Sequence, residues 1–397
     1  MSNNETIKPA PIAIPAEALE DLRRRIATAR WPEREATRDQ SQGVPLDRLR
    51  ALVDYWGREY DWRRCEAQLN AFGPHRTVID GLGIHFLHRR SRHAEALPLI
   101  LTHGWPGSVL EFAKVIGPLT DPEAYGGQAS DAFHVVVPAL PGFGFSDKPA
   151  QAGWNLTRTA QAWAVLMARL GYDGGYVAQG GDLGSAVTCQ MGQQKPPGLR
   201  AIHLNFLPFL TPPPVEGEPS QAEQLALKQI SYYAAKLSAY AELQRTRPQT
   251  LAYALADSPV AQAAWMYDKF TTPVDLDGDV DRSDWIDIAP FDELLDEISL
   301  YWITNSGGSA ARMYWESWGK DFGAFTKVDL PVGCTVFPRE IFRAPRVWAE
   351  RAFANLVHWN EVERGGHFAA WEQPEIFVEE LRTCFRAFRG ASRGGSL

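Results

Sequence analysis

The stretch Gln179-Gly180-Gly181-Asp182-Leu183-Gly184-Ser185 decides the fold of this chain. A short β-prone segment (175–178) precedes it, and a segment with helical character (185–191) follows it. A strand, a tight glycine turn and a helix in this order form a nucleophile elbow, which exposes and strains the residue at its apex. The apex residue is Asp182, so the predicted nucleophile is a carboxylate oxygen and the predicted intermediate is an alkyl ester. The alternative is an ordinary aspartate in a glycine-rich turn, where aspartate is common.

The composition is that of an ordinary globular protein. The chain has 397 residues and a formal net charge of -8, with 45% hydrophobic and 22% charged residues. The negative charge and the lack of basic runs with interleaved aromatic residues argue against a nucleic-acid partner. The four cysteines lie far apart, which gives no zinc spacing and suits free thiols in a reducing compartment. With neither a signal-peptide core nor an apolar run of about 20 residues, we expect a cytoplasmic protein with no membrane partner.

Changes in hydrophobic periodicity divide the chain into five expected units. Strands and helices alternate on both sides of a long helical, aromatic-rich segment that begins after a stiff proline connector. This order predicts an α/β fold with a mostly parallel, doubly wound sheet, a helical lid insertion and an N-terminal helical extension. The units are an N-terminal helical unit with a first hairpin (1–92), the first part of the core (93–205), the lid (206–325), the second part of the core (326–390) and a disordered tail (391–397).

A carboxylate nucleophile of this kind needs a base, and the base needs an orienting acid. In the α/β-hydrolase fold the chain order is nucleophile, acid, histidine. His367 follows the last expected strand in a glycine-rich loop, which lets the imidazole reach back across the sheet. Glu340 follows the preceding expected strand and is the first candidate for the acid, whereas Asp321 and Asp329 come before that strand. We therefore predict that Asp182, Glu340 and His367 act together; a solvated carboxylate that begins a helix is the alternative for Glu340.

An oxyanion hole is expected after an early strand of the core. The motif His103-Gly104-Trp105-Pro106-Gly107-Ser108 follows the apolar run 97–101. The backbone N–H of Trp105 and that of Leu183, next to the nucleophile, would converge on the oxyanion of an ester intermediate. We expect His103 to hydrogen-bond the loop rather than to take part in the chemistry.

These motifs resemble those of the microsomal and juvenile-hormone type of epoxide hydrolase and its soluble bacterial relatives. The resemblance spans nearly everything from Ile12 to Phe388 and includes Ala29-Arg30-Trp31-Pro32-Glu33 and the hairpin 79–88. It implies the α/β-hydrolase fold, an apolar epoxide as small-molecule substrate, and neither a cofactor nor a metal. The animal microsomal enzymes carry an N-terminal membrane anchor that this sequence does not show, which indicates the soluble branch.

The resemblance also assigns residues that the spacing alone leaves open. Phe337-Pro338-Arg339-Glu340 matches the acid position of the family, where glutamate is a known choice. Two lid tyrosines match its proton donors: Tyr314 in Arg312-Met313-Tyr314, and Tyr240 ahead of Thr246-Arg247-Pro248-Gln249-Thr250. Such hydroxyls would donate to the epoxide oxygen as its C–O bond breaks.

Other functions and motifs stay open or are set aside at this stage. A haloalkane or haloacid dehalogenase would use the same aspartate and histidine, and a non-catalytic ligand-binding protein could keep the same scaffold. The G-x-S-x-G match at 390–394 has no room for a following helix, so a serine esterase is disfavoured. The acidic stretch 275–281 lacks the closing glutamate of a calcium loop, and 142–146 is not followed by a dinucleotide-type helix. The sequence leaves a homodimer open.

Overall fold

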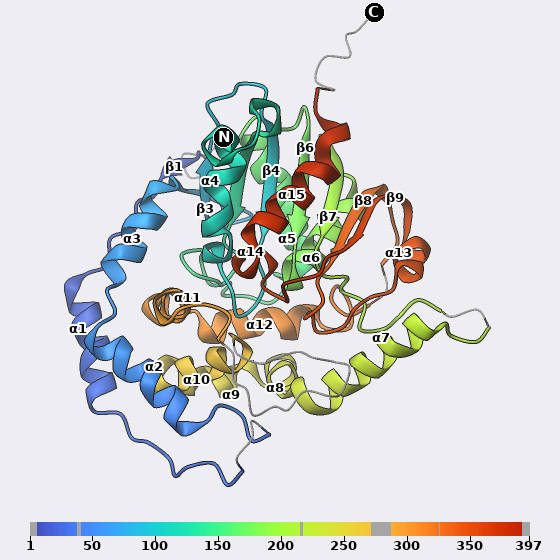
Figure 1. Cartoon of the computed structure of the whole chain (residues 1–397). Coiled ribbons are helices and arrows are strands. Elements are labelled where there is room, and N and C mark those ends of the chain that lie inside the picture. The colour runs from blue at the N-terminus through green and yellow to red at the C-terminus, as the bar shows by residue number, and fades with distance from the viewer. Residues whose placement is uncertain (1–5, 38–40, 215–216, 271–286, 325, 391–397) are drawn as a thin grey trace, which may run out of the picture.

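A twisted sheet forms the centre of the computed structural model, which describes residues 6–37, 41–214, 217–270, 287–324 and 326–390. Within these residues, nine strands follow the order β1-β2-β3-β5-β4-β6-β7-β8-β9 (Figure 1). The pairings β1–β2, β2–β3 and β3–β5 are antiparallel, and all the others are parallel. The strands are β1 (Lys8–Pro9), β2 (Pro74–Ile79), β3 (Leu82–Arg89), β4 (Leu97–Thr102), β5 (Phe133–Pro138), β6 (Tyr176–Gly180), β7 (Leu199–Leu204), β8 (Val328–Val336) and β9 (Phe353–Glu361).

Helices cover both faces of this sheet, which confirms the doubly wound α/β architecture. Helix α15 packs with α4 on one face, and α5 packs with α6 on the other (Figure 1). As the sequence predicts, Asn155 caps α5: its side chain accepts a hydrogen bond of 2.9 Å from the Arg158 N–H, which satisfies one amide of the first turn. The core helices are α4 (Ala113–Thr120), α5 (Leu156–Arg169), α6 (Asp182–Gln194), α13 (Arg346–Ala352), α14 (Ala369–Glu372) and α15 (Pro374–Phe385).

The N-terminal helices lie against the helices that follow the proline connector. In Figure 1 α1 (Ala16–Ala27), α2 (Leu46–Arg58) and α3 (Trp62–Ala71) run along one side of the molecule, from the sheet edge to α10 and α11. Trp56 donates to the Ser299 hydroxyl at 2.8 Å, and Tyr60 donates to Asp296 at 2.8 Å. The proposed lid contains α7 (Gln221–Tyr232), a π-helical turn (Tyr233–Leu237), α8 (Ala239–Thr246), α9 (Pro248–Asp257), α10 (Pro259–Phe270), α11 (Phe291–Thr304) and α12 (Gly307–Ser317). The acidic stretch 275–281 and the tail 391–397 lie outside the described residues.

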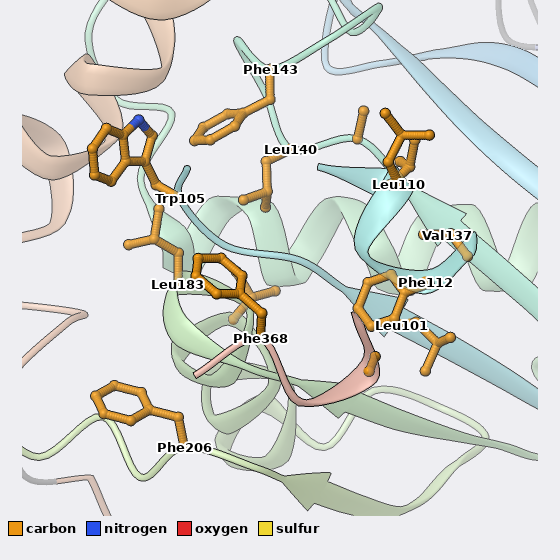
Figure 2. Close-up of a cluster of buried hydrophobic side chains, with 14 of the residues drawn as sticks. Leu101, Trp105, Leu110, Phe112, Val137, Leu140, Phe143, Leu183, Phe206 and Phe368 are labelled. Carbon is orange, nitrogen blue, oxygen red and sulfur yellow. The ribbon is translucent and has the colours of Figure 1, made fainter. Parts of the chain in front are cut away.

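A continuous hydrophobic core links these parts beneath the carboxyl ends of the parallel strands. Leu101 on β4, Leu183 on α6 and Phe368 after β9 all belong to it (Figure 2). Helix α6 lies so close to β4 that a Cβ at Gly184 would overlap the carbonyl oxygen of Thr102. A glycine is therefore needed there, and the close packing fixes where α6 begins.

Candidate active site

Asp182 stands where β6 ends and α6 begins, at the apex of the predicted elbow. Its φ is 48°, the left-handed region that non-glycine residues seldom occupy, so the predicted strain is present. The predicted exposure is wrong, because only 6% of Asp182 is exposed. Trp105 lies over it and donates its backbone N–H to Asp182 Oδ1 at 2.8 Å. Oδ1 is thus held by the backbone, and Oδ2 is the oxygen left to attack a substrate.

His367 and Glu340 lie in the loops that follow β9 and β8. The Nδ1 atom of His367 donates to Glu340 Oε1 at 2.5 Å, and its Nε2 lies 3.5 Å from Asp182 Oδ2. The two loops are tied together because the Arg339 N–H donates to the Gly365 carbonyl at 3.1 Å. The structure therefore places His367 between the other two residues, with Nδ1 toward Glu340 and Nε2 toward Asp182.

The competing acids point elsewhere. Asp329 pairs with Lys195 at 2.8 Å, and Asp321 accepts a hydrogen bond of 2.9 Å from the Thr157 hydroxyl. Of the three acids considered, Glu340 is the one that contacts His367.

The electrostatics of the site favour a charged imidazole in the resting protein. Burial by itself opposes the charge, but the Glu340 and Asp182 carboxylates outweigh it and hold the pKa of His367 well above its usual range. Glu340 is only 2% exposed, and its Oε1 also accepts the Ile341 N–H at 2.7 Å. Both bonds hold Glu340 Oε1 in place, so that it can orient the imidazole.

The loop after β4 carries Trp105, whose N–H is one of the two predicted oxyanion donors. His103 is fully buried; its Nδ1 donates to the Gly104 carbonyl at 3.0 Å and its Nε2 accepts the Leu140 N–H at 3.2 Å. Burial lowers the pKa of His103 to about 4, which keeps it neutral in this structural role. The N–H of Leu183 lies in the first turn of α6, where amides have no partner within the helix. It is therefore available as a second donor directly after the nucleophile in the chain.

The two predicted lid tyrosines meet beside Trp105. The Tyr240 ring stacks on the indole with centroids 4.8 Å apart, and the Tyr314 ring meets it edge-on at 6.1 Å. The Tyr240 hydroxyl lies 3.0 Å from the Tyr233 hydroxyl, whereas the Tyr314 hydroxyl has no hydrogen-bond partner within the described ranges. Burial raises the pKa of Tyr240 and of Tyr314 well above the usual range, so both stay protonated.

A cavity of about 180 Å³ opens next to these groups. Aromatic and aliphatic residues make up about half of its walls, which suits the apolar part of a ligand. The remaining walls are largely charged or polar and include His367 near the triad. The residues that line it include Trp105, Tyr233, Leu237, Tyr240, His367 and Phe368.

Sequence reasoning missed three residues of this region. Tyr233 begins the π-helical turn, and its hydroxyl lies 3.0 Å from that of Tyr240. Asn205 follows β7, accepts a hydrogen bond of 2.6 Å from Gln179, and lines a small cavity with Asp182. Glu111 lines the same cavity; its signal was a lone carboxylate within the otherwise apolar run 109–112.

Comparison with known proteins agrees with this arrangement. Residues 7–112 match the family model "Epoxide hydrolase N terminus", and residues 98–250 match the model "alpha/beta hydrolase fold". A protein of Stigmatella aurantiaca (strain DW4/3-1), assigned by inference to the epoxide hydrolases, is 56% identical over 96% of this chain and 86% of its own. The chain belongs to the epoxide hydrolase family.

Solved epoxide hydrolase structures share the whole architecture. The Aspergillus niger epoxide hydrolase superposes with a TM-score of 0.84 at 30% identity, covering 97% of both chains. The juvenile hormone epoxide hydrolase of the silkworm Bombyx mori superposes with a TM-score of 0.85 at 28% identity, covering 98% of this chain and 96% of its own. The predicted α/β-hydrolase fold and the resemblance to this enzyme family are thus confirmed. In the described part of the chain, no helix is long and apolar enough to cross a bilayer.

Proposed function

We propose that this chain hydrolyses an apolar epoxide to a vicinal diol through an ester on Asp182. The observation that carries the proposal is the chain of contacts from Asp182 through His367 to Glu340. The Trp105 N–H also donates to Asp182 Oδ1. A carboxylate in this position can attack carbon, and an imidazole held by a second carboxylate can then activate water. The aromatic cavity beside them would hold the rest of the epoxide.

In the first step, Asp182 Oδ2 attacks an epoxide carbon and the C–O bond of the ring breaks. Tyr314 and Tyr240 donate hydrogen bonds to the ring oxygen, and one of them transfers its proton to it. Both phenols remain protonated in the resting enzyme because burial raises their pKa. The products of this step are a neutral ester on Asp182 and a tyrosinate. The protonated His367 then gives its Nε2 proton to the tyrosinate, which leaves a neutral imidazole for the second step.

In the second step, water attacks Cγ of the ester. His367 Nε2 takes one proton from the water, and Glu340 stabilises the imidazolium that results. The negative charge forms on Oδ1, where the Trp105 N–H already donates and the Leu183 N–H would add a second bond. The bond between Cγ and Oδ2 breaks and the imidazolium protonates the leaving oxygen. The proton of the new Asp182 carboxyl then passes to His367, which restores the charged imidazole of the resting enzyme.

Heavy-oxygen water tests this route in a single turnover. The first diol would take its new oxygen from Asp182, and the label would appear on the Asp182 carboxyl group. Label that entered the first diol directly would reject the ester intermediate. An Asp182→Ala variant, which lacks both carboxyl oxygens, serves as the control and should form no adduct.

The family comparisons disfavour the dehalogenase considered from the sequence, because the matched relatives are named as epoxide hydrolases. Chloride release from a haloalkane without epoxide turnover would restore it. A ligand-binding protein without catalysis would form no diol from styrene-, terpene- or fatty-type epoxides. We also propose a cytoplasmic location, which the four buried free cysteines suit. The homodimer stays a prediction that light scattering tests.

A further inference from the structure

A second pair of carboxyl groups, one half-buried and one buried, lies near the proposed triad. Glu111 belongs to the short 3-10 helix Val109–Phe112, and Glu297 belongs to α11. Glu297 is only 1% exposed, and neither of its carboxyl oxygens has a hydrogen-bond partner in the described part of the chain. A buried carboxyl group without a partner is costly, so this pair calls for an explanation that the proposed function does not yet give.

The two side chains lie close enough to influence each other. Burial and then the charge of Glu111 raise the pKa of Glu297 well above its usual range. Burial raises the pKa of Glu111 to about 8, with His367 opposing and Asp182 adding to the shift. Two carboxyl groups this close to each other resist being ionised together.

The nearby cations do not neutralise this pair. Arg64 lines the neighbouring cavity and bonds to Asp296 at 2.7 Å, and Lys114 lines it and bonds to Glu293 at 2.7 Å. Both cations are thus already paired with other carboxylates. Neither of these two cations therefore forms a salt bridge with Glu297.

The backbone makes room for Glu111 at this place. A Cβ at Gly107 would overlap the Glu111 carboxyl group, so only glycine allows the side chain to lie there. The Tyr301 hydroxyl donates to the Gly107 carbonyl at 2.8 Å and fixes the loop against α11. The position of Glu111 is thus set by the same motif that carries Trp105.

Glu111 faces a small cavity next to the nucleophile. The cavity measures about 10 Å³, which is about the space that one water needs. Its polar walls are Glu111, Asp182, Asn205 and His367, enough for the two to four hydrogen bonds that hold a buried water. Its other walls are apolar side chains and backbone of the loop around Phe368.

This cavity is distinct from the larger one that would hold the epoxide. The two share His367 and Phe368, but Glu111 and Asp182 line only the small cavity, and Tyr240 and Trp105 line only the large one. An epoxide in the large cavity would therefore leave a water in the small cavity in place. The two reactants of the hydrolysis would reach the ester from different sides.

We propose that Glu111 and His367 hold the hydrolytic water in this small cavity, and that Glu297 positions Glu111 by sharing a proton with it. The inference rests on the proposed ester mechanism. The water donates one hydrogen to His367 Nε2 and the other to a Glu111 oxygen, which leaves a lone pair for Cγ of Asp182. The proton shared with Glu297 keeps Glu111 from competing as a base.

Single-turnover kinetics with styrene oxide separate the two chemical steps. Rapid quenching and mass spectrometry of the intact enzyme would follow the ester as it forms and as it disappears. Glu111→Met keeps the side-chain volume but removes the acceptor, so we expect unchanged ester formation and hydrolysis that is roughly 10- to 100-fold slower. Glu111→Gln keeps a carbonyl acceptor and should hydrolyse the ester within about 3-fold of the wild-type rate.

The role of Glu297 has its own variant and control. Glu297→Met should slow ester hydrolysis by up to about 10-fold, because Glu111 loses the partner that orients it. Glu293→Met, one turn earlier on α11 and paired with Lys114 instead, should leave both steps within about 2-fold. Thermal melting of every variant shows that the enzymes compared are folded. If Glu111→Met does not fold, Glu111→Asp, which withdraws the carboxyl group by one methylene, should slow hydrolysis alone.

Three results separate the inference from the proposed function. Equal slowing of ester formation and hydrolysis in Glu111→Met, without rescue by Glu111→Gln, would show a purely structural role and overturn the inference. Hydrolysis at the wild-type rate in a folded Glu111→Met or Glu111→Asp variant would overturn it too. A wild-type enzyme that forms no ester on Asp182 would instead defeat the proposed function.

Discussion

Glu340→Gln tests most directly whether Glu340 supports the base His367 rather than the nucleophile Asp182, because it changes one charge and almost no volume. The glutamine side chain can still lie beside His367 Nδ1 and the Ile341 N–H, both of which now bond to Glu340 Oε1. What it loses is the negative charge, the strongest influence that raises the pKa of His367 against the opposing effect of burial. The substitution thus acts on the base and leaves the nucleophile untouched.

The size of the effect follows from the bond that is weakened. The contact between His367 Nδ1 and Glu340 Oε1 is short, at 2.5 Å, and it is charge-assisted whenever the imidazole is protonated. A hydrogen bond to a charged group contributes about 1.5–3 kcal/mol. Since about 1.4 kcal/mol corresponds to tenfold in rate, ester hydrolysis should slow by roughly 10- to 150-fold. Ester formation uses Asp182 and the tyrosines, so it should change by less than about 3-fold.

The assay is a rapid-quench measurement of the adduct on Asp182 during a single turnover with styrene oxide. The variant should build up an ester that wild type clears quickly, and steady-state kcat should fall with KM. The matched control is Glu350→Gln on α13, whose carboxylate pairs with Arg346 at the surface. Equal slowing of both steps in Glu340→Gln, or no accumulation of ester, would refute the assignment of Glu340 as the acid that serves the base.

Three further predictions concern the proton-donating tyrosines, the contact of Glu223 on α7 with α13, and the glycine of the elbow. Tyr314→Phe and Tyr240→Phe should each slow ester formation by roughly 10²-fold and leave hydrolysis of the ester nearly unchanged, as the same rapid-quench assay would show. The pKa of Glu223 is lowered from 4.5 to about 2, because the opposing effect of burial is outweighed by hydrogen bonds from Ser220, Arg351 and Trp348. The ionised Glu223 therefore stabilises the fold above pH 4.5, and this contribution is lost as the pH falls toward 2. Glu223→Gln should therefore be less stable in urea at pH 7 and lose less stability on acidification. Gly184→Ala should destabilise the fold by about 1–3 kcal/mol in urea, whereas Gly174→Ala, which has open space around it, should not.

The sequence predicted those parts of the site that depend on local chain direction. The elbow at Asp182 follows from a strand, glycines and a helix within a few residues, and the positive φ confirms it. The positions of His367 and Glu340 follow from parallel strands, whose carboxyl ends lie at one edge of the sheet. Loops after neighbouring strands must meet there, so chain order alone was enough to select them.

The parts that the sequence could not predict depend on how the lid returns to the core. Burial of Asp182 requires Trp105 to lie over it and Tyr240 to stack on that indole, and no periodicity places α8 against the loop after β4. The pairing of Glu111 with Glu297 has the same origin, since each residue read alone is one acidic side chain on a helix. Contacts between distant segments are set by packing, which the local pattern does not encode.

The two carboxylates around His367 explain how one imidazole can serve both steps of the proposed cycle. In the resting enzyme, Asp182 and Glu340 both hold the pKa of His367 high, so the imidazole is charged and cannot compete with Asp182 for the epoxide. Ester formation converts Asp182 into a neutral group and removes one of the two charges. The pKa of His367 must then fall, since burial still opposes the charge and only Glu340 supports it. Esterification of Asp182 thus makes His367 give its proton to the tyrosinate, and the neutral imidazole can then activate the water that hydrolyses the ester.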